Sequence, residues 1–348
     1  MHDVDIKEIE LFDTYPEAFS ILLRDHSRFA QFKQNHLNFD DKQAAEHEND
    51  PENLIIWATD DYVANGPGYT FYEPITVEKI IGENGMLIRP RCEKSIEEQS
   101  RRVKDKAEVF TPSWVCNAQN NLVDEAWFGR NNVFNIEVID EEGNHSWKTT
   151  TEPINSFPEG KSWRDYVRDT RLEITCGEAP YIASRYDATT GNYIPTADRI
   201  GLIDRKLRIV SEHCHKSDEW LKMAQVAFQN TYGYEWQGDN LLLARESLLY
   251  TFLEFYFDKF GKLPQIKSVN CVADIISWNL WQMDGLKMVT PGSCEKATVK
   301  DLFGEVPIKC NACSQGERIG HVGIQCIVKN WSNEKKNQIV KFSSLLSN

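Results

Sequence analysis

The feature that most constrains this chain is an alternation of strand-like and helix-like segments between residues 171 and 277. Residues 171–174 and 232–236 are typical of short strands, and residues 266–277 are β-branched and predict a third strand. Residues 199–214 and 240–260 carry apolar side chains at helical spacing and predict intervening helices. This order predicts an α/β fold with a doubly wound, mostly parallel sheet and helices on both of its faces.

The remaining residues predict small additions at both ends of this fold. Of the 348 residues, 41% are hydrophobic and 11% aromatic, which indicates a sizeable core and excludes a mostly disordered chain. Residues 1–105 predict an acidic N-terminal region, helical at first and then a small sheet. Residues 106–300 would form the α/β domain, and residues 301–348 a C-terminal hairpin.

Targeting and cysteine patterns predict a cytoplasmic protein. No apolar run approaches the ~20 residues that span a bilayer, and the first residues lack the basic and then apolar order of a signal peptide. The 9 cysteines are an odd number in a chain too large to depend on disulfides. We therefore expect a soluble chain in a reducing compartment that does not bind membranes.

The negative charge is concentrated at the N-terminus. The whole chain carries −14, but residues 1–65 hold 15 acidic and 5 basic side chains, so the rest carries only −4. Basic stretches occur at residues 101–106 and 204–208. Because phosphate binding depends on where Lys and Arg gather, the net charge is weak evidence against a nucleic-acid partner.

Three short segments combine strand or helix ends with polar residues. Thr111 precedes Pro112 at a predicted helix start, where free backbone amides can hold a carboxylate. Residues 172–179 (LEITCGEA) predict a strand that ends in an acid and a small-residue turn, which lets a ligand approach the backbone. Residues 232–236 (YGYEW) predict a strand that ends in Glu235, a residue type that accepts hydrogen bonds from ribose hydroxyls, followed by Trp236. Each segment alone is also common in ordinary helix starts and turns.

A fourth segment, residues 274–282 (DIISWNLWQ), completes an ordered set. Together the four resemble the motifs of N6-adenine-specific DNA methyltransferases of restriction–modification systems, in the subclass whose Thr-Pro segment precedes the cofactor motifs. The resemblance covers residues 107–282, about half of the chain. Residues 106–128 and 172–210 are also similar to bacterial restriction-system methylase subunits.

This resemblance implies a class I S-adenosylmethionine-dependent methyltransferase-like fold and methyl transfer to the N6 amino group of adenine in DNA. The setting would be a restriction–modification or phage-defence system, with DNA and a restriction or specificity subunit as partners. The implied binding residues for S-adenosyl-L-methionine are Thr111, Glu173, Cys176, Gly177, Glu235, Trp236 and Asp274. The implied catalytic residues are Asn279, which would accept hydrogen bonds from the target amino group, and Trp281. We expect all of them to face one crevice at the carboxyl ends of the strands.

The last motif departs from the family pattern. The family has Asn-Pro-Pro-Tyr where this chain has Asn-Leu-Trp-Gln at residues 279–282. The alternative is therefore a catalytically inactive methyltransferase-fold protein that acts as a DNA-binding or assembly subunit. Methylation of RNA or of a protein amide nitrogen also stays open.

A separate pattern near the C-terminus has the residue types of a zinc site. Cys310, Cys313, His321 and Cys326 follow one another at short spacing, with glycines in the connecting turn. Three thiols and an imidazole can form a tetrahedral structural zinc site. Free cysteines in an edge hairpin are the alternative.

Overall fold

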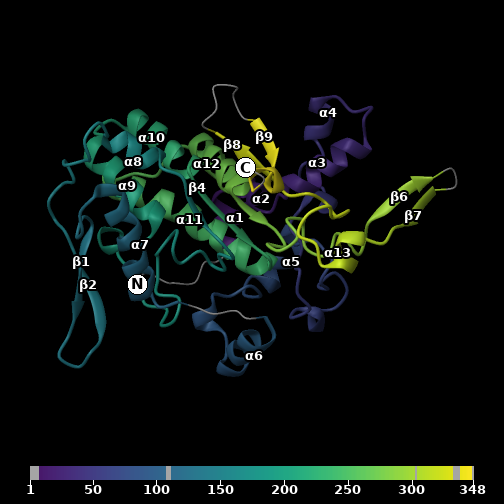
Figure 1. The fold of residues 1–348 in the computed structure, drawn as a ribbon, viewed down its shortest axis with the longest axis horizontal. Helices are drawn as coiled ribbons and strands as arrows, with labels where there is room; N and C mark the ends of the chain where they lie inside the picture. Colours follow the sequence, from purple (N-terminus) through teal and green to yellow (C-terminus); the bar gives the residue numbers. More distant parts are fainter. Residues whose placement is uncertain (1–7, 107–110, 302–303, 332–337, 347–348) are drawn as a thin grey trace.

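A short parallel sheet lies at the centre of the protein. The computed structural model describes residues 8–106, 111–301, 304–331 and 338–346 (Figure 1). The sheet has three strands in chain order, β3 (Arg171–Glu173), β4 (Thr231–Glu235) and β5 (Leu280–Gln282). Both pairings are parallel, with Leu172 opposite Tyr232 and Tyr234 opposite Trp281. The carboxyl ends of the three strands therefore lie at the same end of the sheet.

Two helices separate each pair of neighbouring strands. They are α9 (Leu202–His213) and α10 (Ser217–Gln229) before β4, and α11 (Gly238–Phe260) and α12 (Ile266–Asn279) before β5. These crossovers produce the parallel pairing, because the chain must return to the same end of the sheet before each new strand. Two further helices, α7 (Ser113–Phe128) and α8 (Trp163–Arg168), precede β3.

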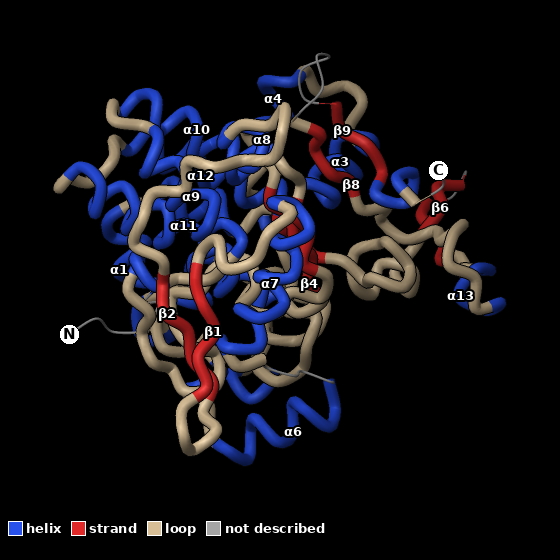
Figure 2. The backbone as a smooth tube through the Cα atoms, turned by 60° about the vertical axis from the view of Figure 1, so that its left-hand side comes forward, coloured by secondary structure: helices blue, strands red, loops and turns tan. Residues whose placement is uncertain are grey.

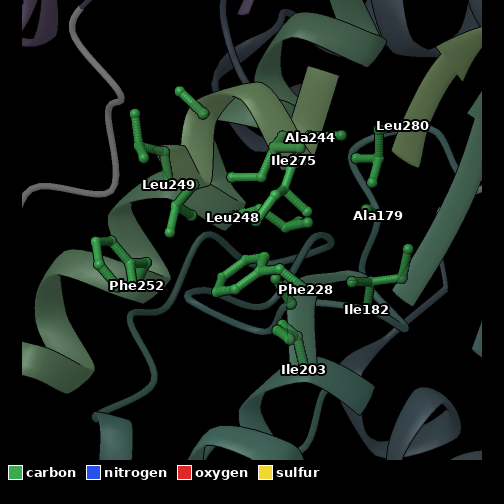
Figure 3. Close-up of a cluster of buried hydrophobic side chains, with 14 of the residues drawn as sticks. Ala179, Ile182, Ile203, Phe228, Ala244, Leu248, Leu249, Phe252, Ile275 and Leu280 are labelled. Atoms are coloured by element: carbon green, nitrogen blue, oxygen red, sulfur yellow. The ribbon is translucent and has the colours of Figure 1, made fainter. Parts of the chain in front are cut away.

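The crossover helices meet in a buried apolar cluster (Figure 3). Ile203 of α9, Phe228 of α10, Leu248 of α11 and Ile275 of α12 belong to it, and each is at most 2% exposed. Burying a side chain of this size contributes about 2 kcal/mol. α11 is buried on nearly all sides, which explains why its sequence reads as apolar rather than as amphipathic.

The prediction of a strand over residues 266–277 is wrong. These residues form α12, a helix of 14 residues that continues to Asn279. Val269, Val272, Ala273 and Ile276 are buried at a spacing of three and four residues, so one helical face enters the core. That periodicity outweighs the β-branched composition. The strand is instead the short segment Leu280–Gln282 that follows directly.

The N-terminal region is helical, as predicted, but the small sheet predicted after it is absent from described residues 53–90. Its α-helices are α1 (Glu8–Thr14), α2 (Pro16–Leu22), α3 (His26–Asn35), α4 (Asp41–Ala45), α5 (Val77–Ile80) and α6 (Ile96–Lys106). Its short 3-10 helices are η1 (Pro51–Asn53), η2 (Val63–Asn65), η3 (Gly82–Asn84) and η4 (Arg91–Glu93). Isolated bridges pair Arg24 with Leu54 and Ile56 with Pro74. Pro74 has no N–H to donate, so this pairing does not extend into a ladder.

This region packs directly on the sheet and its helices. Its apolar side chains belong to the same buried cluster as those of α9 to α12. The Gln282 amide on β5 donates to the Ile56 carbonyl at 2.8 Å and accepts from the Ile56 N–H at 2.9 Å. Arg245 on α11 donates to the Arg24 carbonyl at 2.9 Å and to the Leu280 carbonyl at 2.6 Å. The N-terminal chain is thus hydrogen-bonded to both β5 and α11.

The described residues also form three antiparallel strand pairs outside the parallel sheet. They are β1 (Asn135–Ile139) with β2 (His145–Thr149), β6 (Thr298–Asp301) with β7 (Gly304–Pro307), and β8 (Ile327–Asn330) with β9 (Gln338–Lys341). The first extends from the body of the protein (Figure 2). The last is the hairpin predicted in the C-terminal tail, and it forms its own sheet rather than an edge of the parallel one. The helical segments not yet mentioned are η5 (Thr196–Asp198), α13 (Asn311–Gln315) and η6 (Phe342–Leu345).

In the part of the chain that the structure describes, no helix combines the length and the apolar character needed to cross a membrane.

Candidate functional site

The turn after β3 has an unusual backbone. Thr175, Gly177 and Ala179 all have positive φ, at 46°, 55° and 58°. Two of these residues are not glycine, so the turn carries strain that the surrounding structure must support. The Cys176 N–H donates to the Tyr234 carbonyl at 2.9 Å, which holds the turn against the end of β4. Strained turns of this kind concentrate at ligand sites.

Glu235 holds this turn from the neighbouring strand. Its Oε2 accepts from the Gly177 N–H at 2.9 Å, and its Oε1 accepts from the Gln237 N–H at 3.1 Å. The side chain is buried, and burial raises the pKa of Glu235, while these backbone hydrogen bonds act in the opposite direction. The carboxyl group thus links the ends of β3 and β4.

Glu173 is a second acid at the same end of the sheet, and it is half-buried. The pKa of Glu173 is raised to about 8, chiefly by burial and also by the charge of Glu235, while hydrogen bonds from the backbone N–H groups of Tyr181 and Ile182 act in the opposite direction. The Ile182 N–H lies 3.1 Å from Glu173 Oε2. Two acids with displaced pKa values beside one cavity are typical of functional sites.

Both acids line a cavity of about 940 Å³ at the carboxyl ends of β3 and β4, which we name the strand-end cavity. Its wall includes six residues that the sequence predicted as cofactor-binding, namely Thr111, Glu173, Cys176, Gly177, Glu235 and Trp236. They come from the segment before α7, the β3 turn and the end of β4. Ligands of parallel sheets bind at this position, outside the carboxyl ends of the strands.

Aromatic rings form one side of the strand-end cavity. Trp236 is half-buried, and its Nε1 donates to the Ala58 carbonyl at 3.0 Å. Phe71 lies beside it, with ring centroids 6.2 Å apart and planes at 68°. Sequence reasoning missed Phe71, because no local pattern around residue 71 shows that the N-terminal region reaches this cavity. It also missed Asn240, which lines the cavity from the first turn of α11.

The start of α7 after Thr111 differs from the prediction that its backbone amides are free to hold a ligand carboxylate. The N-cap of α7 is Pro112, and no side chain caps the helix there. The first amide of the helix, the Ser113 N–H, donates to Asp187 Oδ2 at 2.7 Å. This amide is therefore bonded to a carboxylate of the protein itself, although Thr111 does line the cavity.

Asp274 and Asn279 do not reach the strand-end cavity, so the prediction of a single shared crevice is wrong for them. Asp274 lies on α12 and not at a strand end, with its Oδ2 4.0 Å from Lys329 Nζ. Asn279 is the buried last residue of α12. Its Nδ2 donates to the carbonyls of Phe228 at 2.8 Å and Thr231 at 3.1 Å, and its Oδ1 accepts from Trp331 Nε1 at 2.7 Å. Both ends of its amide are used inside the fold.

Trp281 is also a packing residue in this structure. It lies in the middle of β5, 5% exposed, against the rings of Tyr234 and Phe342. The shift of the third strand from residues 266–277 to Leu280–Gln282 explains this placement, since Trp281 then lies within a strand rather than in a loop after it.

The basic stretch at residues 204–208 is internal. Lys206 is fully buried, and its Nζ donates to the carbonyls of Asp169 at 2.6 Å and Asn230 at 2.8 Å. Arg205 is 1% exposed and forms an ion pair with Asp124. Arg102 of the other basic stretch forms a buried ion pair with Asp239. These side chains are therefore not available to bind phosphate.

Three of the four residues predicted to bind a metal lie together, and a different cysteine completes the cluster. Cys310, Cys313 and His321 lie together, and the fourth residue of the cluster is Cys294. The prediction of Cys326 is wrong, because its Sγ lies 3.5 Å from the Gln282 carbonyl, in a separate apolar cluster beside β5.

A second cavity, of about 920 Å³, lies between β2, the segment around η5, and helices α9 and α11. None of the predicted site residues lines it. The candidate site is therefore the strand-end cavity.

Comparison of the whole sequence with protein-family models, with curated proteins and with solved structures finds no match.

Proposed function

We propose that the chain binds S-adenosylmethionine in the strand-end cavity and acts as a methyltransferase-like protein on DNA, in a restriction–modification or phage-defence system. The observation that carries the proposal is the convergence of six motif residues, far apart in the sequence, on one cavity. The position of that cavity at the ends of parallel strands supports it further.

The residues of the strand-end cavity suit an adenosyl cofactor. Each oxygen of Glu235 accepts one backbone hydrogen bond and has capacity for another, from a ribose hydroxyl. Trp236 and Phe71 offer aromatic surface for a purine ring. A Cβ at Gly177 would meet nothing within 4 Å, so a ligand can approach this backbone closely. When bound, S-adenosylmethionine would supply an electrophilic methyl group.

The proposed acceptor is the N6 amino group of adenine in DNA, which the order of the motifs implies. A base in a duplex must leave the stack to reach such a cavity. We do not assign the acceptor contact to Asn279, because its amide is occupied by Phe228, Thr231 and Trp331.

The second candidate is a non-catalytic DNA-binding or assembly subunit on the same fold. The internal hydrogen bonds of Asn279 and the packing of Trp281 favour it, because both residues implied as catalytic are used structurally. Cofactor binding in the strand-end cavity is common to the two candidates, whereas methyl transfer separates them.

The first experiment measures binding of S-adenosylmethionine and of its demethylated product by calorimetry. We expect Glu235→Ala to weaken the affinity about tenfold or more, since a charge-assisted hydrogen bond contributes about 1.5–3 kcal/mol. Asp274→Ala is the matched control, because it removes another acid implied as cofactor-binding that lies outside the cavity. Equal affinities of wild type and Glu235→Ala, or no binding at millimolar cofactor, would contradict the proposal.

The second experiment follows labelled methyl groups into DNA, RNA and protein. Incorporation into DNA supports the enzyme, and incorporation into RNA or protein changes the substrate class. Cofactor binding without incorporation into any of the three favours the non-catalytic candidate.

A further inference from the structure

We propose that Cys294, Cys310, Cys313 and His321 bind one structural zinc ion at the base of the β6–β7 hairpin. One ligand atom of each residue lies within 4.8 Å of the ligand atoms of the other three. Cys294, Cys310 and His321 are buried, and Cys313 is exposed. The cluster does not line the strand-end cavity, so the proposal is independent of the proposed function.

The distances within the cluster match a tetrahedron around one ion. His321 Nδ1 lies 3.4 Å from the Sγ of Cys313, 3.5 Å from that of Cys310 and 3.7 Å from that of Cys294. In a tetrahedral site with Zn–S of about 2.3 Å and Zn–N of about 2.05 Å, sulfur and nitrogen are about 3.6 Å apart. Three sulfurs and one nitrogen at this spacing are a typical zinc ligand set.

The orientation of His321 indicates which of its ring nitrogens would bind the metal. Its Nε2 lies 2.9 Å from the Glu317 carbonyl oxygen, which can only accept a hydrogen bond. The proton is therefore on Nε2, and the lone pair of Nδ1 faces the three sulfurs. Zinc-binding histidines are commonly held in this way by a carbonyl on the other ring nitrogen.

The backbone brings the distant Cys294 to the other three residues without any help from the thiols. Val289 pairs with Gln325 in an antiparallel bridge, and the Thr290 N–H donates to the Ile324 carbonyl at 2.9 Å. Gly323 packs so closely on this segment that a Cβ there would lie 3.0 Å from Cys294 Sγ. The site is thus supported by contacts outside the ligand set.

Little apolar packing surrounds the metal-binding cluster. Among the residues that the structure describes, the local apolar cluster consists of Val289, Cys294, Cys310 and Ala312. The β6–β7 hairpin between Cys294 and Cys310 projects from the protein beside α13 (Figure 1), and every residue of β7 is exposed. Since an isolated two-stranded hairpin is marginal in water, a metal crosslink at its base adds to the stability that the backbone contacts provide. Four protein ligands leave no open coordination position, so the ion is structural.

The first test is the metal content of the purified full chain by inductively coupled plasma mass spectrometry. We expect one zinc per chain, reduced by tenfold or more in Cys313→Ser and Cys294→Ser and unchanged in Cys326→Ser. Cys326 is the matched control because it lies near the cluster in sequence but outside it in space. Chain without bound metal, stoichiometric iron or copper in place of zinc, or loss of zinc from Cys326→Ser but not from Cys294→Ser would overturn the proposal.

The second test uses the unaltered protein and therefore does not depend on the folding of a variant. Cys313 and Cys271 are both exposed, and only Cys313 belongs to the cluster. Treatment with iodoacetamide followed by peptide mass spectrometry should modify Cys271 and spare Cys313 until a chelator is added. Cobalt substitution should give the visible absorption of a tetrahedral sulfur-ligated site. Equal reactivity of the two thiols before chelation would contradict metal binding.

Discussion

The half-buried Glu173 lies beside the buried acid Glu235 at the end of the sheet. A carboxyl group with a pKa of about 8 holds a proton at neutral pH. A protonated Glu173 reduces the repulsion between the two acids, which keeps Glu235 able to accept hydrogen bonds. A neutral Glu173 beside Glu235 thus avoids two facing charges in the strand-end cavity.

The Glu173→Gln substitution tests this protonation state through stability. The folded protein keeps a proton up to about pH 8, whereas the unfolded chain releases it near pH 4.5. As the pH rises between these two values, the unfolding free energy of wild type should therefore fall relative to that of Glu173→Gln, by at most about 1.4 kcal/mol per pH unit. Urea unfolding of both proteins across this range measures the difference. A difference that stays constant with pH would show that Glu173 is ionised in the folded protein.

At the scale of elements, α12 is held at its end by Asn279. The Asn279 side chain joins the end of α12 to the Phe228 carbonyl on α10, the Thr231 carbonyl on β4 and the Trp331 indole. We expect Asn279→Ala to lower the unfolding free energy by about 3 kcal/mol, since it leaves buried polar groups without a partner. Asp274→Ala on the same helix should cost less than about 0.5 kcal/mol. Urea unfolding measures both, and an Asn279→Ala variant as stable as wild type would contradict the structural role.

The elements that could be predicted are those whose local signals agree. Residues 171–174 and 232–236 each carry an acid just before a turn, and β3 and β4 lie there, ending at Glu173 and Glu235. Residues 266–277 were ambiguous because Val and Ile favour strands while their spacing fits a helix, and burial of the helical face decided the outcome. The cavity residues near β3 and β4 could be found because they follow these strands directly.

Residues that tertiary packing alone brings to a site could not be predicted. Phe71 reaches the strand-end cavity from the N-terminal region, and Cys294 joins the cysteine cluster from the far side of a hairpin. Neither lies at a motif spacing from its partners. Cys326 has the better spacing in sequence, yet its amide donates to the Met288 carbonyl at 3.1 Å and its thiol turns toward β5.

At the scale of the whole molecule, the N-terminal region and the parallel sheet share one core. The buried apolar cluster includes Leu11 and Trp57 as well as Leu248 and Leu280. The Arg245 guanidinium adds hydrogen bonds to carbonyls on both sides, and burial lowers the pKa of this group to about 10. Because apolar side chains of the two regions pack against one another in this cluster, neither region retains a complete core without the other.

We therefore expect residues 8–106 and the parallel-sheet region to unfold as one cooperative unit, and Gln282→Ala tests this. The Gln282 side chain makes hydrogen bonds to the backbone of Ile56 at 2.8 and 2.9 Å and to the Trp236 carbonyl at 2.9 Å. Its removal should cost about 2–3 kcal/mol, because buried backbone groups lose their partners. In urea, tryptophan fluorescence and far-UV circular dichroism should shift together to a lower midpoint, whereas Gln34→Ala on the exposed face of α3 should leave the midpoint nearly unchanged. An early separate transition in the Gln282→Ala variant would mean that the N-terminal region unfolds independently, and that the shared core does not couple the two.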